Sequence, residues 1–270
     1  MNILYKYCDQ LGIVKILESL ELKLPYISQV NDPLECLPIF YCPNDKSAIK
    51  ARYLSILKQR NSPVPPDYEQ RLDELYQTGE IQKKLAESSK KCQKDWNEKN
   101  CLLSVSKVAR NTVMWAHYAD KHKGVVIGID FDGVFSANKG ISMDSVNYTE
   151  QRHKVKNLTD FNGSPETFLR VILTKSIEWR YEQEYRTVFF NAGLQSLEQQ
   201  GLAFLKDFNS KKTWFLKLSP ESVREVIFGL YTEDSLKLSI KKLLERPELQ
   251  HVKLYQAEES ETYTLNSREI

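Results

Sequence analysis

Two short segments of the chain combine residue types that could do chemistry. The first is the run EQE (182–184) followed by Arg186, within 181–190, a stretch whose composition predicts a strand. Because side chains alternate along a strand, Glu182, Glu184 and Arg186 are expected on one face, with the two carboxylates about 7 Å apart. Such a pair can position a sugar hydroxyl and stabilise a developing positive charge, as in glycosidic-bond chemistry. The same pattern is typical of a charged strand surface that faces solvent, so the spacing leaves both interpretations open.

The second segment is MWAHYADKH (114–122), in a stretch that predicts a helix. His117 could act as a general base, as a metal ligand, or as a ring that stacks on a base or a nicotinamide. It could equally be a structural residue, and Trp115 with Tyr118 on one helix face favours a core position. His117 and His122 are five residues apart, which puts them roughly 140° apart around a helix. That angle disfavours a shared metal, which needs a four-residue spacing.

A third candidate is the turn SQVNDP (28–33), which follows an expected strand. Asn31, Asp32 and Pro33 predict a tight turn, because Asn and Asp cap their own backbone and Pro stops the strand. Ser28 lies at the strand end just before the turn, where its hydroxyl could reach a ligand.

Composition and missing motifs exclude several classes of protein. The formal net charge of +2 gives no strong overall attraction to nucleic acid or membranes. The sequence contains no GxGxxG, GxxxxGK[ST] or GxSxG motif, so a standard dinucleotide site, P-loop or hydrolase elbow is not indicated. The five cysteines are odd in number and form no CxxC, and no signal sequence or bilayer-length apolar run is present. We therefore expect reduced thiols and a cytoplasmic location.

The candidate residues must be positioned by strands and helices elsewhere in the chain. The order of these expected elements predicts a single α+β domain, 1–270, with one mixed, mainly antiparallel sheet. Period-two patterns and short apolar runs predict strands, and three- and four-residue spacing predicts helices. Expected strands are 4–7, 21–27, 101–107, 124–132, 142–148, 181–190, 213–219, 224–230 and 251–257; expected helices are 11–20, 111–124, 164–176 and 234–245.

A polar stretch at about 44–100 predicts a helical insertion of two or three helices. Between 83 and 99 it contains six lysines against three acidic residues. Such a run is typical of a solvated helix face, and it could also form a local anion-binding arm.

Several motifs in a fixed order resemble a widespread bacterial family of unknown function. They cover almost the whole chain and are LYKY (4–7), SQVNDP (28–33), MWAHYADKHKG (114–124), Tyr148, WRYEQEYR (179–186) and VKLYQA (252–257).

The order of elements also resembles the ADP-ribosyltransferase-like fold, which includes bacterial toxins that modify nucleic acid. That resemblance implies that Glu184 holds the nicotinamide ribose of NAD and stabilises an oxocarbenium-like transition state. It implies that Glu182 orients or deprotonates the acceptor, that Ser28 supports the pocket, and that His117 contacts the cofactor or the target.

The chain departs from that pattern in its first strand, where the transferases carry an arginine for the NAD phosphates. Only Lys6 or Tyr7 stands there. A lysine is a point charge and cannot make the planar two-point contact of an arginine.

Three hypotheses follow from these residues. The first is NAD-dependent transfer of ADP-ribose to a macromolecular acceptor, nucleic acid or protein, in toxin or phage-defence biology. The second is a non-catalytic nucleotide or nucleic-acid binding protein, a sensor whose ligand contacts include His117, Trp115 and Arg186. The third is a metal-dependent hydrolase that uses Glu182, Glu184 and His117.

Overall fold

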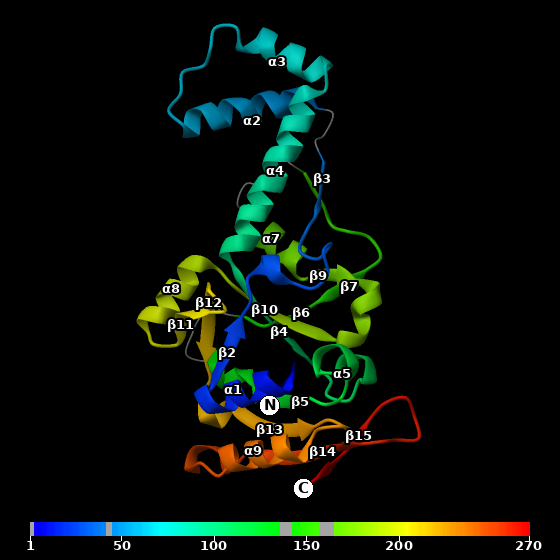
Figure 1. Cartoon of the computed structure of the whole chain (residues 1–270). Helices are drawn as coiled ribbons and strands as arrows, with labels where there is room; N and C mark the ends of the chain where they lie inside the picture. The colour runs from blue at the N-terminus through cyan, green and yellow to red at the C-terminus, as the bar shows by residue number, and fades with distance from the viewer. Residues whose placement is uncertain (1–2, 42–44, 136–141, 157–164) are drawn as a thin grey trace.

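The computed structural model describes residues 3–41, 45–135, 142–156 and 165–270, and its main sheet has eight strands (Figure 1). All neighbouring strands are antiparallel except β13 and β14, which are parallel. The predicted α+β class with a mixed, mainly antiparallel sheet is therefore confirmed. In spatial order the strands are β15 (Asn266–Glu269), β14 (Lys253–Glu258), β13 (Val223–Phe228), β5 (Val125–Asp130), β1 (Ile3–Cys8), β4 (Cys101–Ser106), β10 (Glu184–Phe189) and β6 (Asp144–Ser145).

Three smaller sheets surround the main one. A three-stranded sheet is antiparallel, and two parallel pairs lie near the candidate residues. They are β11 (Ala203–Phe208), β12 (Lys211–Lys217) and β2 (Glu21–Leu24); β3 (Ile39–Tyr41) with β8 (Lys154–Lys156); and β7 (Asn147–Thr149) with β9 (Thr174–Ser176).

Helices flank the sheets and bury the faces that their spacing predicts. In α1 the side chain of Asp9 accepts a hydrogen bond from the Gly12 amide, which caps the helix, and Ile13 and Leu17 are fully buried. The other helices outside the insertion are short. The set is α1 (Gln10–Ser19), α5 (Thr112–Tyr118), α6 (Phe131–Phe135), α7 (Pro165–Ile172), α8 (Asn191–Gln199) and α9 (Asp234–Leu244), with 3₁₀ turns η1 (Ile27–Gln29), η2 (Ile177–Glu182), η3 (Pro220–Ser222) and η4 (Pro247–Leu249).

Between β3 and β4 the chain forms an arm that projects from the body (Figure 1). It consists of α2 (Lys46–Gln59), α3 (Tyr68–Gln77) and α4 (Glu80–Lys99), in the stretch where helices were expected. The arm has a small core of its own around Ile49, Leu72 and Ile81. The lower part of α4 joins the body, because the amides of Gln93 and Asn97 donate to the carbonyl oxygen of Cys36 at 3.0 and 3.4 Å.

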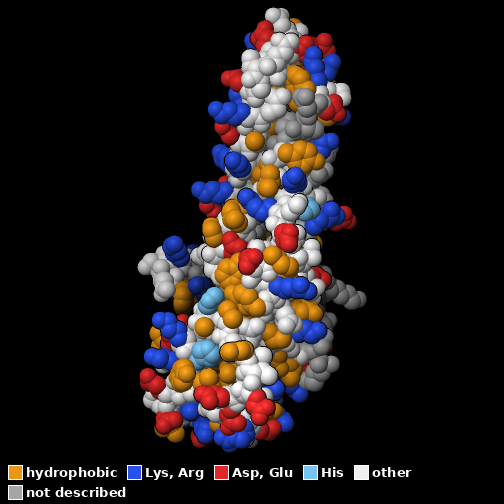
Figure 2. Space-filling model, turned by 90° about the vertical axis from the view of Figure 1, so that its right-hand side faces the viewer, with side chains coloured by type: hydrophobic (Ala, Val, Ile, Leu, Met, Phe, Trp, Pro, Cys, Tyr) orange, Lys and Arg blue, Asp and Glu red, His pale blue; other side chains and the backbone are white. Residues whose placement is uncertain are grey.

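The lysines of α4 are all exposed, and acidic residues are interspersed with them (Figure 2). Lys84 and Lys94 pair with Glu80 and Glu98 one turn away. This arrangement favours the solvated-face interpretation of the lysine run.

Two expected elements are shorter than their patterns predict. The strand expected at 181–190 begins only at Glu184, because 177–182 is a 3₁₀ helix and Gln183 has a left-handed φ of 42°. The helix expected at 111–124 ends at Tyr118, and the three residues from Asp120 to His122 have positive φ. Left-handed backbone at these positions stops the repeating geometry that a periodic pattern assumes.

Two further predictions were right only in part. The helix expected at 164–176 ends at Ile172, and its last residues instead form β9, paired with β7. The strand expected at 142–148 is split into β6 and β7. Ser164, expected at that helix start, and Cys42 lie outside the described residues. The patterns also missed β3, β8, β11, β15, α6 and α8.

No helix among the described residues is long and apolar enough to cross a membrane. Their cysteines, Cys8, Cys36, Cys92 and Cys101, are free thiols.

Candidate active site

Three segments that are distant in sequence meet through hydrogen bonds of their side chains. Asn31 of the turn after η1 donates to the hydroxyl oxygen of Tyr118, at the end of α5, at 2.8 Å. The Tyr118 hydroxyl donates in turn to Glu182 Oε1 at 2.6 Å. On the same turn, Asp32 Oδ2 accepts a hydrogen bond from the indole nitrogen of Trp179 at 3.1 Å. The turn, the helix and the EQE run therefore build one site.

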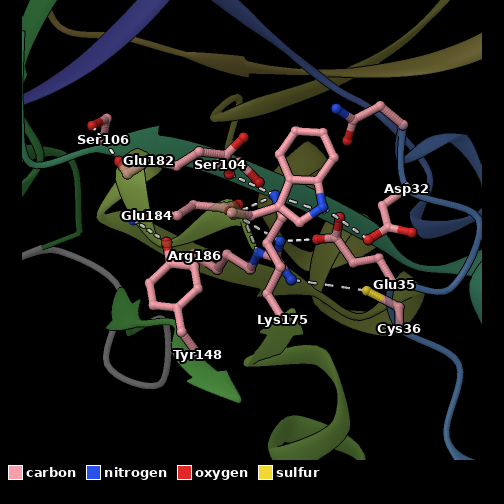
Figure 3. Close-up of polar contacts among 12 residues, drawn as sticks. Asp32, Glu35, Cys36, Ser104, Ser106, Tyr148, Lys175, Glu182, Glu184 and Arg186 are labelled. Atoms are coloured by element: carbon pink, nitrogen blue, oxygen red, sulfur yellow. Dashed lines mark hydrogen bonds and ion pairs between the residues drawn. The ribbon is translucent and has the colours of Figure 1, made fainter. Parts of the chain in front are cut away.

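At the centre of this site lies a buried group of five ionisable side chains, here called the charged cluster. It consists of three carboxylates and two cations, which are Glu35, Glu182, Glu184, Lys175 and Arg186 (Figure 3). All five residues are at most 6% exposed. The carboxylates therefore do not form the solvent-facing strand surface that the sequence left open.

Lys175 connects the three carboxylates. Its Nζ lies 2.6 Å from Glu182 Oε2, 3.1 Å from Glu184 Oε2 and 3.5 Å from Glu35 Oε2. Burial lowers the pKa of a lysine, but Glu184 and Glu182 outweigh it and raise the pKa of Lys175. Lys175 is therefore a fixed positive charge at the centre of the cluster.

Arg186 holds Glu184 from the other side. Its Nε and Nη2 bind Glu184 Oε1 and Oε2 at 2.6 and 2.8 Å, a two-point contact that fixes the carboxylate plane. Its other donors bind Glu35 and the carbonyl oxygen of Ile172. Burial lowers the pKa of Arg186, but an arginine with such partners stays charged at neutral pH. Arg186 therefore anchors the cluster, and its guanidinium is occupied by protein groups.

The cluster has one more carboxylate than it has cations, and this excess falls on Glu184. Burial raises the pKa of Glu184 to about 7, and the attraction of Lys175 opposes that rise. The hydroxyl of Tyr148 accepts a hydrogen bond from the Glu184 amide at 2.8 Å and fixes the start of β10. A carboxyl group with a pKa near neutrality can both hold and release a proton at the site.

We expect the free energy of unfolding to fall as the pH rises from about 5 to about 8, through the proton bound by Glu184. The pKa of Glu184 is about 7 in the folded chain against an ordinary 4.5, so the folded state binds more protons in this range. The effect is on the order of 2–3 kcal/mol. Urea unfolding of the parent and of Glu184→Gln across this range isolates it from other titrating groups. Parallel pH dependences of the two proteins would contradict this assignment.

A cavity of about 160 Å³ opens onto the cluster, and all five cluster residues line it. Lys6 and Tyr7 of β1 also line it, together with Tyr118. The Lys6 amine donates to the carbonyl oxygen of Ser104 at 2.9 Å, and burial lowers its pKa. Tyr7 turns its hydroxyl away to the carbonyl oxygen of Val108 at 2.9 Å. Lys6 thus contributes a third basic side chain to the cavity lining, beside Lys175 and Arg186.

Two residues that were predicted to serve the site, Ser28 and Trp115, do not line the cavity, and a third, His117, lies at its rim. Ser28 is exposed on η1 and is not among the described residues that line the cavity. Trp115 is fully buried, packs edge-on against Tyr7, and donates its indole hydrogen to the carbonyl oxygen of Ala109 at 2.8 Å. It is a core residue, and its neighbour Tyr7 stands between it and the cavity. His117 is exposed at the rim, and its Nδ1 lies 3.3 Å from the Tyr181 hydroxyl.

An aromatic rim surrounds His117. Figure 2 shows hydrophobic side chains beside the histidines of the body. The rings of Tyr118, Trp179 and Tyr181 lie 6.1, 6.4 and 6.2 Å from the His117 ring. Each of them lines a different pocket: Tyr118 the cavity, Trp179 a pocket of about 290 Å³, and Tyr181 a groove of about 610 Å³. The cluster therefore lies where several binding spaces adjoin.

Sequence reasoning missed two members of the cluster, Lys175 and Glu35. Glu35 follows the Asn-Asp-Pro turn by two residues, so its closeness to that turn was a usable signal. The residues around Lys175 contain no such signal, and its segment was expected to be helical.

Among the described residues, no group of three or more His, Cys, Asp and Glu side chains is arranged to hold a metal ion. The cluster carboxylates instead direct their oxygens at Lys175, Arg186 and Tyr118.

Residues 114–187 match the model of a family described as "Protein of unknown function (DUF2971)". The matched segment runs from α5 to β10 and contains four of the five cluster residues. Over this segment the chain is similar to a family of unknown function, which is consistent with the resemblance that its motifs indicated. No curated protein and no solved structure matches the chain.

Proposed function

We propose that the charged cluster is the active site of an ADP-ribosyltransferase that uses NAD as its sugar donor and a macromolecule as its acceptor. The observation that carries the proposal is Glu184, a buried carboxyl group at the cavity wall with a second carboxyl group, Glu182, held beside it by Lys175. Two carboxyl groups in a sheltered pocket are what the cleavage of a glycosidic bond requires.

The chemistry is a substitution at the anomeric carbon of the nicotinamide ribose. The bond from this carbon to the nicotinamide nitrogen breaks, and nicotinamide leaves with the electron pair. Ionised Glu184 stabilises the positive charge that develops on the ribose. An acceptor oxygen or nitrogen then forms the new bond, and Glu182 takes its proton.

Other side chains supply binding. Lys6 offers a partly buried cation at the cavity wall for the diphosphate of NAD. His117 and the aromatic rim offer ring faces for the nicotinamide or for the acceptor. Arg186 acts on the ligand through Glu184, because its guanidinium is bound to protein oxygens.

The test is to incubate the full chain with NAD labelled in its adenylate part and with cell lysate. We expect transfer of label by the parent, a loss of at least about 100-fold in Glu184→Gln, and normal transfer by the matched control Glu198→Gln. Glu198 is an exposed carboxylate on α8.

Equal labelling by parent and Glu184→Gln, or none by either, removes the proposal. Binding of NAD by both proteins without turnover would instead identify a nucleotide-binding module. Activity that is lost on chelation and restored by a divalent metal would identify a hydrolase of the third kind.

A further inference from the structure

We propose that a groove beside the charged cluster binds single-stranded nucleic acid and presents it to Glu184. The groove, of about 610 Å³, is here called the tyrosine groove and is lined by Lys107, Tyr148, Arg180, Tyr181, Glu184 and Tyr185, among other residues. Binding stands on its own, whereas the role of the bound strand as ADP-ribose acceptor rests on the proposed function.

The charge of the tyrosine groove suits a phosphate backbone. Lys107 and Arg180 are both exposed, and neither forms an ion pair with another described residue. The acidic residue among the described lining is Glu184, which is buried and already paired with Lys175 and Arg186. Two cations without acidic partners at the lips of a groove attract phosphates and release counterions on binding.

The rings of the groove suit bases. Tyr148, Tyr181 and Tyr185 are each partly buried, so one part of each ring packs on protein and another part lines the groove. The hydroxyls of two of them are fixed, Tyr148 by the Glu184 amide and Tyr181 by His117. Rings held in place lose little freedom on binding, and stacking on them tolerates any base.

The tyrosine groove also leads to the reacting group. Glu184 is a lining residue of both this groove and the cavity, so a strand in the groove lies next to the residue that the proposed reaction uses. On α4 of the arm, by contrast, Lys84 and Lys94 are paired with acids of the same helix. Unpartnered cations together with tyrosine rings favour nucleic acid over a protein acceptor.

The test is fluorescence anisotropy of short labelled single-stranded DNA and RNA with the full chain, at about 50 and about 200 mM salt. We expect the double variant Lys107→Gln/Arg180→Gln to bind at least about 10-fold more weakly and with a salt slope lower by about 1. Tyr181→Leu is expected to bind about 5- to 100-fold more weakly. The control Lys90→Gln/Lys91→Gln, on the exposed face of α4, should bind as the parent does.

Unchanged binding by the groove variants, an equal loss in the arm control, or no binding of either strand by the parent overturns the inference. The inference is also overturned if the labelled product survives nuclease treatment and is protein, while the chain binds no oligonucleotide. That outcome would assign a protein acceptor. If oligonucleotides bind but neither the parent nor any variant transfers label from NAD, the assignment of the groove stands and the proposed reaction is wrong.

Discussion

Replacing Lys175 by methionine is expected to lower the free energy of unfolding by about 3–5 kcal/mol at about pH 8. Lys175 Nζ lies within 3.5 Å of an oxygen of each of three buried carboxylates. Methionine keeps much of the side-chain volume but removes the charge, so three carboxylates remain against the single cation Arg186. Leaving buried charges uncompensated is far more costly than losing an exposed ion pair.

The pH and a matched control make the Lys175 prediction specific. Lys94→Met removes the exposed Lys94–Glu98 pair of α4 and should cost less than about 0.5 kcal/mol. At about pH 5 the cost of Lys175→Met should shrink, because protonation of Glu184 relieves the repulsion. Urea unfolding of the three proteins at both pH values measures this. Similar stabilities of the two variants would show that the cluster carboxylates are not ionised together in the folded state.

Replacing Trp115 by alanine is expected to cost about 3–5 kcal/mol of unfolding free energy. The side chain is fully buried, with its ring centroid 5.5 Å from that of Tyr7 and 6.2 Å from that of His122. Its removal leaves a void directly behind the cavity wall, and it leaves the Ala109 carbonyl without the indole donor.

Trp115→Phe serves as the control, because it keeps an aromatic ring and loses the hydrogen bond, at about 1–2 kcal/mol. Thermal and urea unfolding rank the parent and both variants. A Trp115→Ala protein that unfolds like the parent but has lost ligand binding would restore Trp115 as a direct ligand contact.

Much of the main sheet could be predicted, because its strands carry local signals. The apolar run at β5 is buried along almost its whole length, and the Leu-Tyr-Lys-Tyr run predicted β1. The turn after η1 was predictable from Asn31, Asp32 and Pro33. Short strands such as β3 and β8 could not be predicted, since three residues give too short a pattern and their partner is over 100 residues away.

The EQE run belongs to the candidate site, although its secondary structure was predicted incorrectly. Glu182 and Glu184 were expected together on one strand, whereas Glu182 closes a 3₁₀ helix and only Glu184 begins β10. Both carboxylates still reach Lys175, because the left-handed Gln183 redirects the chain between them.

The other contacts of the charged cluster could not be predicted from local sequence patterns, for a physical reason. Glu35 binds Arg186 from 151 residues away, and a pairing over such a distance leaves no spacing to read in either segment. A buried ion pair is specified by the three-dimensional fold, and the residues beside each partner need not differ from those of a surface charge.

The helix α4 connects the arm rigidly to the body of the molecule. Its 20 residues form a rod of about 30 Å that starts in the arm and ends one residue before β4. Near its C-terminal end, the side-chain amides of Gln93 and Asn97 donate hydrogen bonds to the carbonyl oxygen of Cys36, the neighbour of Glu35. A displacement of α4 would therefore move Cys36 together with the neighbouring Glu35, and it would also move β4, which pairs with the strand that carries Glu184.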